Sequence, residues 1–150
     1  NGCMGRFYTI DSANERLPEV RAILERLREQ RAELIALREE LHARRQPPET
    51  TANDRPAERA PEGRRARAAS EAEELRLRMR GVIDQMEAAV QQLVDWDISL
   101  RDIESGLVDF PALANGRQIW LCWRLGEDQI GWWHELEAGF AGRRPLIDLA

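Results

Sequence analysis

The chain has 150 residues, a formal net charge of −5, and 22 basic residues that are all arginine. Arginines alternate with glutamates along the predicted helices, and from Asp95 onward ten acidic residues outnumber five arginines. This distribution lacks the clustered positive face of a nucleic-acid-binding protein, and no apolar run approaches the roughly 20 residues of a membrane helix.

The first part of the sequence predicts an extended segment and turn over residues 1–16 and a long helix over residues 17–45. Ser12 and Glu15 have the spacing of a capping box, and Pro18 fits only the first turn of a helix. Apolar residues recur at heptad spacing along this helix, which indicates an apolar stripe on one side.

A proline-rich stretch over residues 46–69 separates this helix from a second one over residues 70–96. The stretch has four prolines, dense charge and no aliphatic residue larger than alanine, so it is predicted to be a flexible loop. Ser70 and Glu73 match a second capping box, and an unbroken heptad pattern starts at Leu75. The two helices are predicted to fold back antiparallel. Their apolar stripe is wider than one partner helix covers, so we expect the hairpin to dimerise.

From Ile98 the hydrophobic period changes to alternation, which predicts a β-meander over residues 98–137 and a C-terminal tail over residues 138–150. The Asn115-Gly116 pair between two apolar runs is the strongest short-range hairpin signal. The predicted strands are Ile98–Ile103, Leu107–Leu113, Arg117–Leu125 and Gln129–Glu137.

The Asn-Gly turn sets the pairing of the two central strands. A two-residue turn pairs residues 114 and 117, which places Asp109 opposite Cys122, and a three-residue turn at residues 104–106 places Arg101 opposite Asp109. The apolar face, predicted to pack on the helices, carries Leu100, Val108, Phe110, Ile119, Leu121 and Trp123. The mixed face, predicted to be an oligomer interface or a ligand surface, carries Arg101, Asp109, Trp120, Cys122 and Arg124.

The fourth strand has two registers open to it. A three-residue turn places Trp132 and His134 on the mixed face, whereas a two-residue turn at Glu127 and Asp128 places them on the apolar face. We favour the first register because it keeps the polar His134 out of the core.

Asp109, Glu127 and His134 are candidate ligands of a divalent metal, since carboxylate and imidazole suit Zn, Fe or Mn. Their spacing matches no ligand motif. In the predicted register Asp109 and His134 lie two strands and two residues apart, roughly 12 Å, which is too far for one ion. A shared site then needs another register or ligands from a second subunit. The alternative for His134 is a hydrogen-bonded histidine beside Trp120 or Glu135.

Cys122 is the cysteine that lies in a predicted strand. A nucleophilic thiol needs a histidine in reach, and neither register places His134 there, so Cys122 is predicted to pack in the core. The Arg101 and Asp109 pair also fits a simple cross-strand ion pair. The glycine-rich segment Gly139–Pro145 holds two arginines that suit an anion. It lacks phosphate-loop spacing, however, and is predicted to be a crossover that packs against the helices.

Four strings, FYTIDSANERLPEV, GLVDFP, LCWRLGE and WWHELEAGFAGRRP, resemble the bacterial and archaeal domain of unknown function 2203. The resemblance covers nearly the whole chain apart from the proline-rich loop, and its motifs are long and specific. It implies the helical hairpin and the block rich in glycine, aspartate, tryptophan and histidine. It brings no activity, cofactor or partner with it.

The sequence therefore predicts a single-domain α+β protein, in which a long antiparallel helical hairpin packs on a small antiparallel β-meander. Two cysteines without a disulfide framework favour a cytoplasmic location. We expect a binding or assembly module that is a homodimer through the hairpin, with neither nucleic acid nor membrane as partner. One alternative is a metal-dependent enzyme or metal-binding protein with the Asp109, Glu127 and His134 site at a subunit interface, where Arg124 holds an anionic substrate. The other is a small-molecule binder whose ligand surface holds Arg101, Trp120, Cys122, Arg124 and Trp132.

Overall fold

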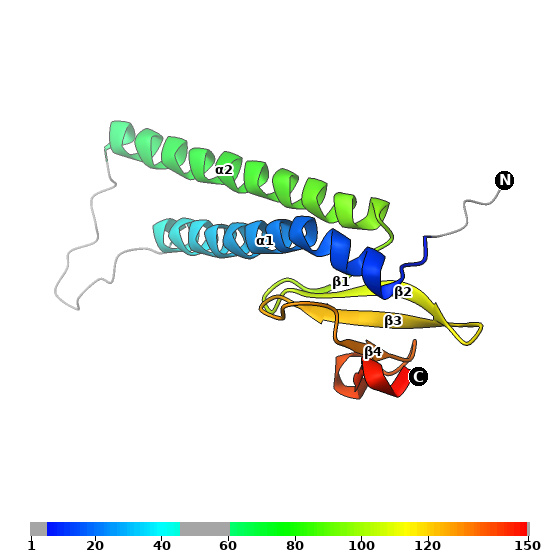
Figure 1. Ribbon diagram of the computed structural model, residues 1–150. Helices are drawn as coiled ribbons and strands as arrows, with labels where there is room; N and C mark the ends of the chain where they lie inside the picture. Colours follow the sequence, from blue (N-terminus) through cyan, green and yellow to red (C-terminus); the bar gives the residue numbers. More distant parts are fainter. Residues whose placement is uncertain (1–5, 46–60, 150) are drawn as a thin grey trace, which may run out of the picture. The chain divides into compact units, whose positions relative to one another are not determined.

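The computed structural model describes residues 6–45 and 61–149. Two long helices, α1 (Ile10–Arg45) and α2 (Glu62–Asp95), precede a five-stranded antiparallel sheet, which confirms the predicted α+β class (Figure 1). The chain divides into two compact units, one with the residues up to Arg31 and from Met86 onward, the other with Ala32–Gln85. Among the described residues no helix is both long and apolar enough to cross a membrane.

Helix α1 begins at Ile10, earlier than predicted, because Thr9 and not Ser12 caps it. The backbone N–H of Ser12 donates to Oγ1 of Thr9 at 3.0 Å, and the N–H of Thr9 donates to Oγ of Ser12 at 2.9 Å. These reciprocal bonds satisfy two N–H groups at the start of the helix. Pro18 therefore lies inside the helix and not in its first turn. The buried neighbours Leu17 and Val20 hold that part of the helix on the sheet, which offsets the hydrogen bond lost at the proline.

Helix α2 begins at Glu62, so the prediction of a loop over residues 46–69 is wrong for its last eight residues. The N–H groups of Arg64 and Arg65 donate to the backbone oxygen of Pro61 and open the helix. Arginine and alanine dominate residues 62–69 and are strong helix formers, a preference that outweighs the low apolar content. Residues 46–60 lie outside the described residues.

The unit Ala32–Gln85 contains the end of α1 and the beginning of α2. Four of its apolar side chains are buried, and they come from both helices: Leu37, Leu41, Leu75 and Val82. Arg44 of α1 forms an ion pair with Glu71 of α2. Three of these four side chains, Leu41, Leu75 and Val82, occupy predicted heptad positions, so the heptad pattern marks most of the buried apolar residues of this unit.

The strands are β1 (Ser99–Asp102), β2 (Leu107–Ala114), β3 (Arg117–Arg124), β4 (Trp132–His134) and β5 (Arg144–Pro145). They lie in the sheet in chain order, each antiparallel to the next. Asn115 and Gly116 both have positive φ, 52° and 80°, and form the predicted two-residue turn. Strand β5 was not predicted. It lies in the tail over residues 138–150 between two short 3-10 helices, η1 (Phe140–Gly142) and η2 (Leu146–Leu149).

The pairing of β1 differs from the prediction. Ser99, not Arg101, lies opposite Asp109, and the register shifts between Leu100 and Asp102. The loop between Asp102 and Leu107 has four residues in place of the predicted three-residue turn, which moves β1 along β2. Arg101 sits at the irregularity.

The apolar face of the sheet packs on the helices as predicted. Val108, Phe110, Ile119, Leu121 and Trp123 join one buried cluster, and Leu100 packs against it. Helix α1 contributes residues that repeat every three or four positions, which places them on one side of the helix: Ala13, Leu17, Val20, Leu24 and Leu27. This packing holds the central strands rigidly and leaves their opposite side chains on the mixed face.

Candidate functional site

The mixed face brings together Asp109, Cys122 and His134 from β2, β3 and β4. Asp109 pairs with Cys122, and His134 pairs with Trp120, so all three residues share one face of the sheet, as predicted. Their exposed fractions are 2%, 0% and 2%. One ligand atom from each lies within 4.8 Å of the other two. Carboxylate, thiol and imidazole are the groups that proteins use to bind transition metals.

The predicted separation of Asp109 and His134 is wrong. Nε2 of His134 lies 3.0 Å from Oδ2 of Asp109, far closer than roughly 12 Å. The strand positions are as predicted, because His134 pairs with Trp120, and Trp120 pairs with Pro111, two residues from Asp109. The prediction used the distance between backbone positions, whereas the side chains of Asp109 and His134 extend toward each other over β3.

Both ring nitrogens of His134 face oxygen atoms. Nδ1 lies 2.7 Å from the backbone oxygen of Glu135, which only accepts hydrogen bonds, so Nδ1 carries a proton and donates it. A neutral imidazole then has its lone pair on Nε2, directed at the Asp109 carboxylate. Two acceptor atoms 3.0 Å apart attract each other only with a cation, either a proton or a metal ion, between them.

Asp109 is only partly satisfied by its neighbours. Oδ2 accepts a hydrogen bond from Nε of Arg101 at 2.8 Å, and the same oxygen lies 3.0 Å from Nε2 of His134. The other carboxylate oxygen, Oδ1, is buried and has no hydrogen-bond partner among the described residues. Burial of an unpaired carboxylate oxygen costs free energy, so this atom marks a place for a further donor or a metal ion. The expected cross-strand pair of Arg101 with Asp109 is present despite the changed register.

The Cys122 thiol is protonated at neutral pH in this environment. Burial raises its pKa from the ordinary 9.0 to about 12, the Asp109 carboxylate adds to the rise, and Arg143, 3.9 Å from Sγ, opposes it. A nucleophilic cysteine needs a lowered pKa and a histidine that takes its proton. Both nitrogens of His134 are already engaged, so the geometry argues against a cysteine nucleophile even though the histidine is nearer than predicted.

Glu127, the third metal ligand proposed from the sequence, does not join this cluster. Its carboxylate accepts two hydrogen bonds from Arg143, at 2.6 and 3.2 Å, and one from the backbone N–H of Arg124 at 2.7 Å. Burial works to raise the pKa of Glu127, but the bonds from Arg143 and Arg124 and their charges outweigh it and lower the pKa. The Arg143 guanidinium also lies over Trp132, 4.4 Å from the ring centroid.

The sequence therefore led us to propose Asp109, Glu127 and His134 as metal ligands, and Cys122 only as part of a ligand surface, whereas the structure brings Asp109 and His134 together with Cys122 and not with Glu127. Sequence reasoning missed Arg143 as a contact of the thiol. The two arginines that follow Gly142 were the signal, but only the pairing of β5, which begins directly after Arg143, places Arg143 at the thiol. Strand β5 has only two residues, which is too short for a hydrophobic alternation that would predict it.

The other members of the predicted ligand surface surround the cluster. Trp120 and Trp132 are partly buried, and the Arg101 guanidinium lies 4.9 Å from the Trp120 ring centroid. Arg124 is exposed and lies over Phe140, 5.6 Å from its ring centroid. Within the described residues, its side chain forms no hydrogen bond or ion pair with Asp109, Cys122 or His134, which makes it a matched control for Arg101.

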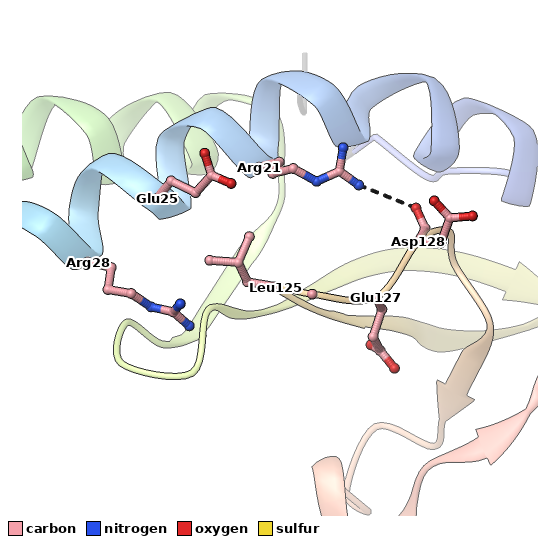
Figure 2. Close-up of a pocket in the computed structure, with 7 residues that line it drawn as sticks. Arg21, Glu25, Arg28, Leu125, Glu127 and Asp128 are labelled. Carbon is pink, nitrogen blue, oxygen red and sulfur yellow. Dashed lines mark hydrogen bonds between the residues drawn. The ribbon is translucent and has the colours of Figure 1, made fainter.

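A pocket of about 450 Å³ lies elsewhere, between α1 and the loop that joins β3 to β4 (Figure 2). Arg21, Glu25 and Arg28 line it on the helix side, and Arg21 donates to the backbone oxygen of Asp128 at 3.4 Å. The side chain of Glu127 points away from the helix in Figure 2, consistent with its pairing to Arg143. The pocket mixes both signs of charge and includes none of the clustered residues.

The sequence matches the family described as an uncharacterized conserved protein (DUF2203) over residues 6–146. The chain belongs to this family, as the resemblance implied. No curated protein and no solved structure matches it.

Proposed function

We propose that this member of the DUF2203 family is a metal-binding protein that holds one divalent transition-metal ion on Asp109, Cys122 and His134. One observation carries the proposal. Nε2 of His134 and Oδ2 of Asp109 lie 3.0 Å apart with both lone pairs facing, and the adjacent Oδ1 is buried without a partner. A metal ion satisfies all three atoms at once, whereas a proton satisfies only the facing pair.

The ligand types favour zinc among the metals considered. Thiolate is a soft ligand that selects zinc over manganese, and imidazole and carboxylate are both common at zinc sites. Iron is second, since it shares the imidazole and carboxylate ligands. Glu127 has no part in the proposal, because Arg143 engages both of its carboxylate oxygens.

The surrounding hydrogen bonds support the same function. Metal-binding histidines usually donate their other ring N–H to a carbonyl or carboxylate, as Nδ1 of His134 does to Glu135. Ligating carboxylates are likewise held by outer partners, as Arg101 holds Asp109. Three strands of one packed sheet supply the ligands, so a metal ion meets side chains already close to their binding positions.

Metal content tests the proposal directly. Purified protein is incubated with equimolar zinc, desalted into metal-free buffer and analysed by mass spectrometry for zinc. We expect about one zinc per chain for the wild type and a large loss for Cys122→Ser and His134→Ala. His42→Ala is the matched control, because it removes the other histidine, which lies in the unit Ala32–Gln85, and should retain zinc.

Two outcomes would refute metal binding. The first is a wild-type content below about 0.1 zinc per chain under these conditions. The second is an unchanged zinc content in Cys122→Ser, which replaces sulfur by oxygen and preserves the shape of the side chain. If His134→Ala unfolds, Cys122→Ser alone decides the matter, and circular dichroism identifies that case.

Homodimerisation through the helices is a second proposal, on a separate observation. Leu77 of α2 lies outside the heptad positions and is a large apolar side chain that is 63% exposed. A second copy of the chain in the cytoplasm would cover this side chain. Light scattering at micromolar concentration should report a dimer for the wild type and a monomer for Leu77→Glu. A monomeric wild type would end this proposal and leave the metal site unaffected.

A further inference from the structure

The proposed metal ion has three protein ligands, and this number leaves one coordination position. Structural zinc sites are usually closed by four protein ligands, whereas zinc with three protein ligands takes water or a substrate atom in the fourth position. Within the described residues no further histidine, cysteine or acidic side chain joins the cluster of Asp109, Cys122 and His134. The fourth ligand therefore comes from outside this part of the chain.

Formal charges decide which kind of ligand suits that position. When a metal ion displaces the proton of the Cys122 thiol, the resulting thiolate and the Asp109 carboxylate balance the two positive charges of the metal ion. Arg143 is balanced by Glu127, with which it forms two hydrogen bonds. Arg101 has Asp109 as its carboxylate partner, at 2.8 Å, and that charge is already counted against the metal. One positive charge is left over, that of Arg101, whose side chain is 42% exposed, so this charge attracts an anion to the solvent side of the cluster.

Arg101 has the donors to receive that anion. Only its Nε is engaged, on Oδ2 of Asp109, and its two terminal nitrogens have no hydrogen-bond partner in the described part of the chain. Its guanidinium lies over Trp120, which holds the plane in place, and 42% of its side chain is exposed. The free edge of a planar guanidinium matches two oxygens of a carboxylate or a phosphate.

We propose that the metal-loaded protein binds a small oxyanion, with one oxygen on the metal ion and another on the terminal nitrogens of Arg101. This inference rests on the proposed metal site. Its chemical class is a carboxylate or a phosphate, and the anion enters from the solvent side where Arg101 is exposed. Arg101 is the residue that selects an oxyanion over water at the fourth position.

Cobalt substitution tests the inference, because the visible spectrum of bound Co²⁺ reports changes in its ligands. Cobalt-loaded protein is titrated separately with acetate and with inorganic phosphate. We expect a saturable spectral change with at least one of them, and the ratio of the two dissociation constants identifies the preferred class. Arg101→Gln should raise the dissociation constant of the anion about tenfold or more, since it removes a charged donor pair. Arg124→Gln, an exposed arginine of the same face, should have no effect.

The results separate this inference from the metal site itself. Failure to bind cobalt refutes the proposed function. Cobalt at one per chain with no spectral response to either anion overturns the oxyanion inference and leaves metal binding intact. An equal response in wild type and Arg101→Gln also overturns it. Arg101→Lys keeps the positive charge beside Asp109, so an intermediate affinity in this variant assigns the remaining loss to the two-pronged guanidinium.

Discussion

Replacement of Cys122 by alanine in metal-free protein tests how strongly the sheet suppresses ionisation of this thiol. Burial is the main reason that the pKa of Cys122 rises from 9.0 to about 12, with the Asp109 carboxylate as the second. The folded thiol therefore keeps its proton at pH values where the thiol of an unfolded chain loses it. Removal of the thiol removes this difference between the two states.

The sign and size of the effect follow from the two pKa values. Below pH 9 both states are protonated, and the contribution of the thiol to stability is complete. Above pH 9 the unfolded state binds fewer protons than the folded state, so the free energy of unfolding falls as the pH rises. The fall is about 1.4 kcal/mol per pH unit until the folded thiol titrates, or roughly 2–3 kcal/mol between pH 9 and pH 11.

Urea denaturation followed by tryptophan fluorescence measures the effect, at a series of pH values from about 8 to about 11. Both proteins carry Cys3→Ser, because Cys3 lies outside the described residues and its thiol also titrates. We expect the wild type to lose stability more steeply than Cys122→Ala, since the other titrating groups are common to both. If the free energy of unfolding changed with pH in the same way for the two proteins, the folded thiol would ionise as readily as an unfolded one. Burial would then not raise its pKa.

Four further substitutions test the fold. Gly106→Ala should lower the free energy of unfolding by about 2–4 kcal/mol, because φ is positive and the new Cβ would lie 2.5 Å from Cβ of Leu125. Gly116→Ala also has positive φ but open space around it, so urea denaturation should show a smaller loss, and equal losses would contradict the clash. Thr9→Ala should cost about 1 kcal/mol by the same measurement, through loss of the helix cap, and no loss would argue against Thr9 as the cap. Leu24→Ala, at 0% exposure, should cost about 2–5 kcal/mol in thermal or chemical denaturation, and a loss below 1 kcal/mol would contradict its place in the core.

The class of fold and the central strand pairing were predictable because both depend on local signals. Heptad spacing identified the helices, and alternation identified the strands. The Asn115-Gly116 turn set the pairing of Asp109 with Cys122, since a two-residue turn leaves only one register. Element ends were less predictable. Thr9 and Ser12 offer competing caps, and only the packing of the following residues on the sheet decides between them.

The residues that make up the mixed face could likewise be predicted from the sequence. Trp132 and His134 lie on the predicted face, because a polar histidine is costly in an apolar core. The distance between the functional groups could not be predicted from the sequence. Strand spacing gives the separation of the backbones, but the contact between Asp109 and His134 depends on the directions of their two side chains over β3.

Alternation and turn chemistry thus determined which residues of this protein share a face, because each depends on neighbours within a few positions in the chain. Tertiary structure alone decided which atoms meet on that face. Arg143 reaches Cys122 from the C-terminal segment, and Arg101 reaches Asp109 from a displaced register. The first contact joins positions far apart in sequence, and the second depends on a shifted strand pairing. In both, side-chain length and packing set the distance between the atoms, and no local sequence pattern encodes it.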